Sequence, residues 1–183
     1  LPYQLELVPL PIPAEAKSRF QERAVLGKVP VVAIDGLWLT ESLAISEYLA
    51  EAFPIPAHPR LFPADLGDRA RARQVMSWLR TDLGALREAR PTSSVFGPPA
   101  TAPLGDAAAA QAAELVRVAS RLVGDRPAMF ADWCIADADL ALALMRLLAS
   151  GDPLPDALRA YAAGQWQRPS LRAFVERAAA AHR

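Results

Sequence analysis

The sequence predicts a two-part protein, in which a small α/β unit is followed by a larger, all-helical unit. Three observations predict this order. Strand-like, β-branched runs lie before residue 54 and flank an Asp-Gly turn. The stretch PIPAHPRLFP, residues 54–63, holds four prolines and predicts an extended linker. Beyond it Ala, Leu and Arg dominate, and apolar residues recur at spacings of three and four, which is typical of helices.

The first element is predicted from an alternation of apolar and polar residues. Residues 3–8, YQLELV, alternate in this way and predict a strand with one apolar face. Three prolines follow and forbid regular pairing. Residues 15–26 have mixed polarity, so a helix and an irregular segment both stay open for them.

A β-hairpin and a helix follow. Residues 29–34 are apolar on both faces and predict a central strand. Asp35-Gly36 supplies the positive φ angles of a tight turn into residues 37–39. Thr40 is expected to cap the next helix, whose apolar residues have helical spacing.

The second unit is predicted to be helical throughout. Residues 75, 79, 83 and 86 form one apolar stripe, and the proline-rich residues 91–104 predict a loop. Three further helical segments are expected, with a loop near residues 165–169; they cover residues 106–123, 135–148 and 171–183.

Composition narrows the classes of function. Lys plus Arg and Asp plus Glu both total 20, so no net field favours nucleic acid or an anionic membrane. No apolar run has the length of about 20 residues that a membrane helix needs. Cys134 is the single cysteine, and His58 and His182 lie far apart, so neither a disulfide nor a metal site is expected. We therefore expect a cytoplasmic protein without a metal, a nucleic-acid partner or a membrane partner.

The Val29-Pro30 step is the first candidate binding feature. A proline at the head of a strand lacks the N–H group that a ladder requires, so the chain is expected to bend there, through a cis peptide. The bend would leave the main chain of Val29 to pair with an extended, peptide-like ligand. A purely structural role, in which Pro30 shapes the turn into the strand, is equally open.

The Glu41-Ser42 step is the second candidate. It lies at a helix start, where unpaired N–H groups and the helix dipole attract a carboxylate. Ser42 adds a hydroxyl donor and Glu41 can hold an amine, so the pair suits a zwitterionic amino-acid group. Simple capping by Thr40, with an acidic first turn, is the competing interpretation.

Longer segments resemble a known family. VPVVAIDGLWLTESLAISEYL is similar to the second half of the thioredoxin-like domain of cytosolic glutathione transferases. The segments ARARQVMSWLRTDLGALREARPTSSVF, WCIADADLALALMRLL and QWQRPSLRAF resemble the bacterial YfcF subgroup. The resemblance covers almost the whole chain and implies a thioredoxin-like domain over residues 1–53, a linker over 54–64 and an all-α domain over 65–183.

The resemblance also implies roles for individual residues. Val29 would bond the cysteinyl main chain of glutathione, Pro30 would be the cis-proline, and Glu41 and Ser42 would hold the γ-glutamyl group. Lys28, beside Val29, is the candidate for the glycyl carboxylate. Residues 3–8 match the family's second strand, so its first strand, its first helix and a catalytic serine are expected upstream of Leu1.

The implied activity is glutathione transfer. Glutathione would be the co-substrate, its thiol activated for conjugation to a small electrophile or for reduction of a peroxide, in detoxification or oxidative stress. A homodimer is expected from the family, and Trp78 is the candidate contact for the second substrate. A non-catalytic glutathione-binding or interaction module with the same fold is the alternative.

One family feature is altered in this chain. The family's second domain has a capping step in which a Ser or Thr precedes an Asp by three residues, and here the two positions are Cys134 and Asp137. A thiol is a poorer acceptor than a hydroxyl, so Asp137 is expected to do more of the capping. Cys134 is expected to be buried and protonated rather than nucleophilic.

Overall fold

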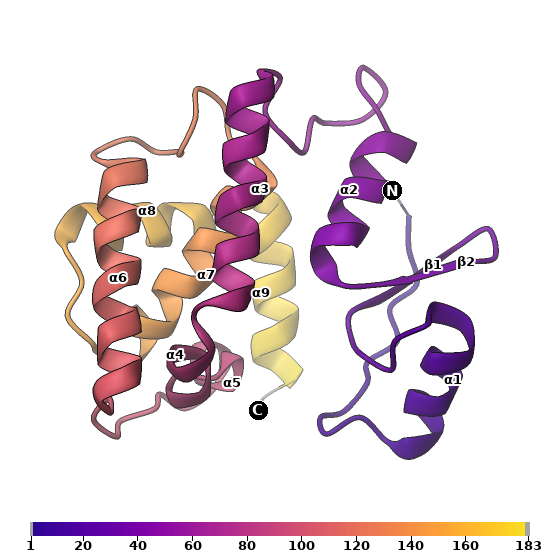
Figure 1. The fold of residues 1–183 in the computed structure, drawn as a ribbon, viewed down its shortest axis with the longest axis horizontal. Helices are drawn as coiled ribbons and strands as arrows, with labels where there is room; N and C mark the ends of the chain where they lie inside the picture. Colours follow the sequence, from indigo (N-terminus) through magenta and orange to yellow (C-terminus); the bar gives the residue numbers. More distant parts are fainter. Residues whose placement is uncertain (1, 182–183) are drawn as a thin grey trace. The chain divides into compact units, whose positions relative to one another are not determined.

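The computed structural model describes residues 2–181, with side chains up to Arg177; Leu1, His182 and Arg183 lie outside the described residues (Figure 1). The chain divides into two compact units, Leu1–Pro59 and Arg60–Arg183.

A β-hairpin is the centre of the first unit. β1 (Val31–Ile34) pairs antiparallel with β2 (Leu37–Thr40), in a register that places Val31 opposite Thr40. The turn residues Asp35 and Gly36 have φ angles of 48° and 87°, as a tight hairpin turn requires. The predicted hairpin is therefore confirmed.

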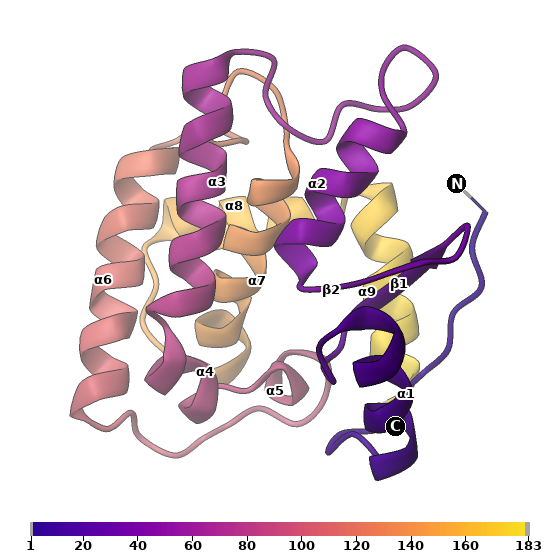
Figure 2. The same ribbon diagram turned by 45° about the vertical axis from the view of Figure 1, so that its right-hand side comes forward.

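Two helices pack on this hairpin. α1 (Ala14–Ala24) and α2 (Ser42–Ala52) both contact β2, and both ribbon views place them on opposite sides of it (Figures 1 and 2). Phe20 and Ala24 of α1 and Ile45 of α2 are buried. The hairpin thus has apolar cover on each side, and residues 15–26, which sequence alone left open, are mostly helical.

Three expectations for the first unit are wrong. Residues 3–8 form no strand, and Tyr3 and Leu7 are 65% and 73% exposed. A strand needs a ladder partner, and within residues 2–181 the sheet consists of β1 and β2 alone, so β1 is not a central strand there either. Thr40 does not cap α2, because it ends β2 opposite Val31, and Glu41 takes the N-cap position.

The second unit is helical. Residues 53–65 precede its first helix and contain no helix or strand, and Leu61 accepts a 2.8 Å main-chain hydrogen bond from Ile135. Its helices are α3 (Leu66–Thr81), α4 (Gly84–Ala89), α5 (Thr92–Phe96), α6 (Asp106–Val123), α7 (Ile135–Ser150), α8 (Asp156–Trp166) and α9 (Pro169–Ala181).

α7 is the central helix of this unit. It contacts α3, α5, α6 and α8, and eight of its residues are buried. Residues 135–148 were predicted to be buried on most sides, and this is confirmed. The loop predicted for residues 91–104 is only partly correct, because it includes the short helix α5, where Phe96 stacks on Trp166 with ring centroids 6.4 Å apart.

Two buried arginines tie the α4–α5 junction to the far end of α7. Arg90 donates to both carboxylate oxygens of Asp152, at 2.6 and 2.8 Å. Arg146 donates to the carbonyl of Arg90 at 2.7 Å and to the hydroxyl of Thr92 at 2.8 Å. Buried charges are stable only when they are bonded in this way.

Candidate functional site

The hairpin brings the two candidate steps to one end of the first unit. Val31 lies opposite Thr40, so residues 28–30 and residues 41–42 both lie just beyond the last pair of the ladder. β2 runs directly into α2 at this point (Figure 2). The register of the hairpin therefore determines the distance between the candidate residues.

The main chain of Val29 is not used by the sheet. The Val29–Pro30 peptide bond is cis, as the sequence predicted. Val29 is half-buried, and within residues 2–181 its N–H and carbonyl form no hydrogen bond with another main-chain group. Both groups are thus available to a ligand with a peptide backbone.

The start of α2 has no side-chain cap. Glu41 occupies the N-cap with φ 67° and ψ 108°, and its side chain makes no capping bond. Ser42 is the first helical residue, and its carbonyl accepts a 2.8 Å bond from the Ser46 hydroxyl. A non-glycine residue at such a φ is strained by about 1–3 kcal/mol, and strain of this kind is concentrated at functional sites.

Lys28 and Glu41 form an ion pair across the end of the hairpin. Lys28 Nζ lies 3.6 Å from Glu41 Oε1, and the two side chains are 69% and 51% exposed. The cation belongs to the residue that precedes Val29, and the anion belongs to the N-cap residue of α2. This arrangement offers an opposite charge to each end of a zwitterionic peptide.

Gly27 lies where the segment of residues 27–29 passes close to α1. A Cβ atom at Gly27 would lie 2.8 Å from Lys17 Cγ and 2.9 Å from Gln21 Cγ, which is closer than real Cβ atoms approach. The absence of a side chain at Gly27 thus allows residues 27–29 to pack on α1.

Trp78 lies in the second unit. It is half-buried and lines a groove of about 590 Å³ between α3 and α6, together with Arg71, Arg117 and Arg121. The sequence analysis did not predict this groove. The available signal was a stripe at spacings of three and four on each helix.

Cys134 and Asp137 form a buried capping site. The Asp137 carboxylate accepts bonds from Cys134 N at 2.9 Å, Met129 N at 2.8 Å and Tyr161 Oη at 2.7 Å. Burial, with the nearby Asp137 charge, raises the pKa of the Cys134 thiol to about 12. The expected burial of Cys134 and the capping role of Asp137 are confirmed, whereas the contribution of Tyr161 had no signal in the sequence.

The described residues contain no group of three or more His, Cys, Asp or Glu side chains placed to hold a metal ion. Across the described helices, none combines the length and the apolar character that crossing a membrane requires.

Sequence models of one family match both units. The model described as "Glutathione S-transferase, N-terminal domain" matches residues 1–52, and "Glutathione S-transferase, C-terminal domain" matches residues 65–180. The matched residues include all the candidate site residues.

Individual relatives give the same result. "Glutathione S-transferase T1" of Arabidopsis thaliana is 37% identical over 102 residues, which are 56% of this chain and 41% of the relative. A "Probable maleylacetoacetate isomerase" of Caenorhabditis elegans is 43% identical over 74 residues, 40% of this chain and 32% of the relative. The chain thus matches less than half the length of these relatives.

A solved structure covers more of the chain. It is a glutathione transferase homologue from Burkholderia GL BGR1 with bound glutathione, which is 37% identical with a TM-score of 0.76. The match covers 97% of this chain and 84% of that one. A glutathione S-transferase from Rhodospirillum rubrum F11 is 25% identical, with a TM-score of 0.65 over 85% of this chain and 73% of its own. The expected fold, a thioredoxin-like unit followed by a helical domain, is confirmed.

Proposed function

Because this chain belongs to the glutathione S-transferase family, we propose that it binds glutathione at the end of its hairpin and activates the thiol of the tripeptide. The observation that carries the proposal is the Lys28–Glu41 ion pair, which lies beside the available main chain of Val29 and the uncapped start of α2. The homologue from Burkholderia GL BGR1, solved with bound glutathione, supports the choice of ligand.

Each part of glutathione has a proposed partner. The Val29 main chain pairs with the cysteinyl main chain, next to the cis-proline Pro30. Glu41 binds the γ-glutamyl amine, and Ser42 with the start of α2 binds the γ-glutamyl carboxylate. Lys28 binds the glycyl carboxylate. The ion pair would then open, and each of its members would take one end of the ligand.

Activation of the thiol requires a lowered pKa. The thiolate is the nucleophile, whereas a thiol with an ordinary pKa near 8.5 is mostly protonated at neutral pH. Each unit by which the pKa falls requires about 1.4 kcal/mol of preferential stabilisation of the anion. A hydroxyl donor and a helix N-terminus facing the sulfur would stabilise the anion, and we propose that the described residues supply the contacts that bind the rest of the tripeptide.

We propose a small electrophile or a peroxide as the second substrate, with Trp78 as its candidate contact. Some relatives bear the name maleylacetoacetate isomerase, so glutathione-dependent isomerisation belongs among the reactions to assay. We further propose a cytoplasmic homodimer that acts in detoxification or the response to oxidative stress. The alternative is a glutathione-binding module without turnover, since a fold does not determine activity.

Calorimetric titration of glutathione into the purified protein tests the binding site. We expect Ser42→Ala to weaken binding about tenfold, because it removes a hydrogen bond to a charged group. The matched control is Ser18→Ala, which removes an exposed serine from α1 in the same unit. Equal affinities of the wild type and Ser42→Ala would show that the γ-glutamyl site is assigned wrongly.

Turnover assays separate the enzyme from the alternative. With glutathione saturating, a chloronitrobenzene, cumene hydroperoxide and a maleyl compound report conjugation, peroxide reduction and isomerisation. Binding without turnover of any of the three would favour the non-catalytic module.

A further inference from the structure

The turn between β1 and β2 is the one place in the sequence where an aspartate is followed by glycine. Asp35 and Gly36 form this turn, and both residues are exposed. The Ile34–Leu37 pair adjoins it, so the turn lies at the opposite end of the ladder from the residues assigned to glutathione. An aspartate before glycine places a carboxyl group next to a main-chain nitrogen that no following side chain shields.

Neither reacting group of this step is held by other residues. The Asp35 carboxylate forms no hydrogen bond or ion pair with another described residue. Within residues 2–181, the Gly36 N–H donates no main-chain hydrogen bond. A Cβ atom at Gly36 would meet no atom within 4 Å, so the space around this residue is open. The carboxyl carbon and the nitrogen are therefore free to approach each other.

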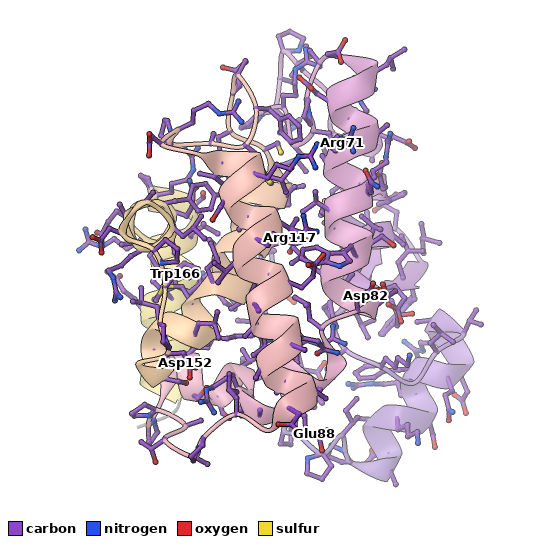
Figure 3. All side chains as sticks on the ribbon, turned by 60° about the vertical axis from the view of Figure 1, so that its left-hand side comes forward. Arg71, Asp82, Glu88, Arg117, Asp152 and Trp166 are labelled. Atoms are coloured by element: carbon purple, nitrogen blue, oxygen red, sulfur yellow. The ribbon has the colours of Figure 1, made fainter. Side chains whose placement is uncertain are left out.

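The other aspartates of the chain lack these conditions, because each is followed by a residue with a side chain. Asp82 lies at the end of α3 and precedes Leu83, and Asp152 lies just beyond α7 (Figure 3). Asp152 precedes Pro153, which has no N–H group. The Asp152 carboxylate is also bound by Arg90, at 2.6 and 2.8 Å.

The turn depends on a main chain of normal length. Asp35 and Gly36 have φ angles of 48° and 87°, which are those of the two-residue turn that matches the twist of paired strands. If the chain ran through the Asp35 side chain instead, the path between its Cα and the Gly36 nitrogen would gain one carbon atom. The turn would then no longer fit the Ile34–Leu37 pair.

We propose that Asp35 is a site of spontaneous isoaspartate formation, and that this modification opens the turn end of the hairpin. The Gly36 nitrogen attacks Asp35 Cγ and loses its proton, a C–N bond forms, and a carboxyl oxygen leaves as water. The product is a five-membered succinimide ring. The modification does not depend on glutathione binding.

Water then opens the ring at one of its two carbonyl carbons by breaking the bond between that carbon and nitrogen. Cleavage at the Asp35 main-chain carbonyl leaves Gly36 joined to Cγ, which is isoaspartate, and cleavage at Cγ restores aspartate. One water is released and one is taken up, so the mass is unchanged and no group is oxidised or reduced.

Incubation of the folded full chain at neutral pH, followed by tryptic digestion, tests the site. Trypsin releases residues 29–60 as one peptide, in which Asp35 is the single aspartate. We expect a second form of this peptide, of equal mass, to accumulate. It should resist endoproteinase Asp-N, which does not cleave before isoaspartate. It should also accept a methyl group from S-adenosylmethionine through an isoaspartyl methyltransferase. Peptides that contain Asp82 or Asp132 are the internal controls.

Two variants keep a turn-forming residue at position 35. Asp35→Gly accepts the positive φ and carries no carboxyl group, so it should give no second form. Asp35→Asn also suits this turn and should react faster than the wild type, because an amide releases ammonia more readily than a carboxylate releases water. Unchanged circular dichroism and thermal melting would show that both variants fold.

Hydrogen exchange on the separated, modified protein tests the structural consequence. We expect the amides of residues 34 and 37 to exchange faster than in the unmodified protein, because their pair adjoins the altered turn. Exchange in the helices of the second unit should be unchanged and is the control.

Three results would overturn the proposal. Isoaspartate at residue 35 could form in urea but not in the folded protein, which would show that the turn protects this step. The second form of the peptide could also appear in Asp35→Gly, which would place the change at another residue. Finally, the modified protein could keep the original exchange at residues 34 and 37, which would show that the turn accommodates the longer main chain.

Discussion

Lys28 Nζ lies 3.6 Å from Glu41 Oε1, and this contact joins the two segments to which we assign the ends of glutathione. Both side chains are more than half exposed, so the pair contributes at most about 1 kcal/mol to the free energy of unfolding. A ligand with an ammonium group at one end and a carboxylate at the other can therefore displace it at little cost.

Reversal of both charges tests this relationship. In Lys28→Glu/Glu41→Lys an ion pair can still form, so we expect the free energy of unfolding in urea to change by less than about 1 kcal/mol. Each end of glutathione would now meet a like charge, and its affinity should fall by about a hundredfold, measured by calorimetry. Retention of affinity in a folded double variant would contradict the assigned orientation of the tripeptide.

The backbone conformation of Glu41 predicts that two substitutions there weaken glutathione binding equally but differ in their effect on stability. Its φ of 67° is strained for a side-chain-bearing residue but accessible to glycine. Glu41→Gly and Glu41→Ala both remove the carboxylate, and both should bind glutathione about tenfold more weakly. Only the glycine variant relieves the strain, so it should be the more stable of the two by about 1 kcal/mol in urea unfolding. Equal stability would show that the conformation is not strained.

Gly27 should be intolerant of a side chain. Gly27→Ala places a Cβ atom against Lys17 and Gln21, and we expect a loss of about 1–3 kcal/mol in urea unfolding together with weaker glutathione binding. Lys17→Ala/Gln21→Ala added to this variant removes the two opposing Cγ atoms and should restore both properties. Gly84→Ala is the control, because a Cβ there meets no atom within 4 Å. Failure of the rescue would rule out the steric explanation.

Asp137 should be among the more important residues for the stability of the second unit. Asp137→Ala leaves the Cys134 and Met129 N–H groups and the Tyr161 hydroxyl without their acceptor, and we expect a loss of about 3 kcal/mol or more. Asp132→Ala, at an exposed position nearby, should change the unfolding free energy by less than about 0.5 kcal/mol. Similar losses in the two variants would argue against the buried network.

The buried thiol predicts a loss of stability at alkaline pH. An unfolded cysteine ionises near pH 8.5, whereas the folded Cys134 keeps its proton until a pKa of about 12. The contribution of the protonated Cys134 to the free energy of unfolding is therefore fully present below about pH 8.5. It is lost as the pH rises toward 12, by up to about 1.4 kcal/mol per pH unit. Burial also raises the pKa of Tyr161, which acts in the same direction above its ordinary pKa. Urea unfolding of Cys134→Ser should show a shallower alkaline decline than that of the wild type, and an identical decline would contradict this account.

The features of the fold that could be predicted from the sequence are those that depend on neighbouring residues. The Asp35-Gly36 turn was recognisable because two adjacent positive φ angles favour those residue types. The apolar content of α7 likewise predicted its burial. The cap of α2 was not recognisable, because Thr40 is a good capping residue in isolation and only the ladder pairing with Val31 withdraws it from that role.

Features that depend on distant contacts were not predictable. The alternating pattern of residues 3–8 indicates a strand, but such a strand forms only beside a partner, and the described residues supply none. Lys28 and Glu41 were each named as candidates, while their contact follows from the register of the hairpin. The groove around Trp78 requires α3 and α6 to lie side by side although they are separated by two other helices in the chain.

The burial of Cys134 has a consequence for the glutathione chemistry that we propose for this protein. Mixed disulfides form when a thiolate attacks an accessible disulfide, and electrophiles alkylate accessible thiolates. Cys134 is 1% exposed and burial raises the pKa of its thiol to about 12, so neither a disulfide nor an electrophile meets an accessible thiolate at this residue. Oxidised glutathione and reactive second substrates, the compounds proposed for this protein, would therefore leave its single cysteine unmodified.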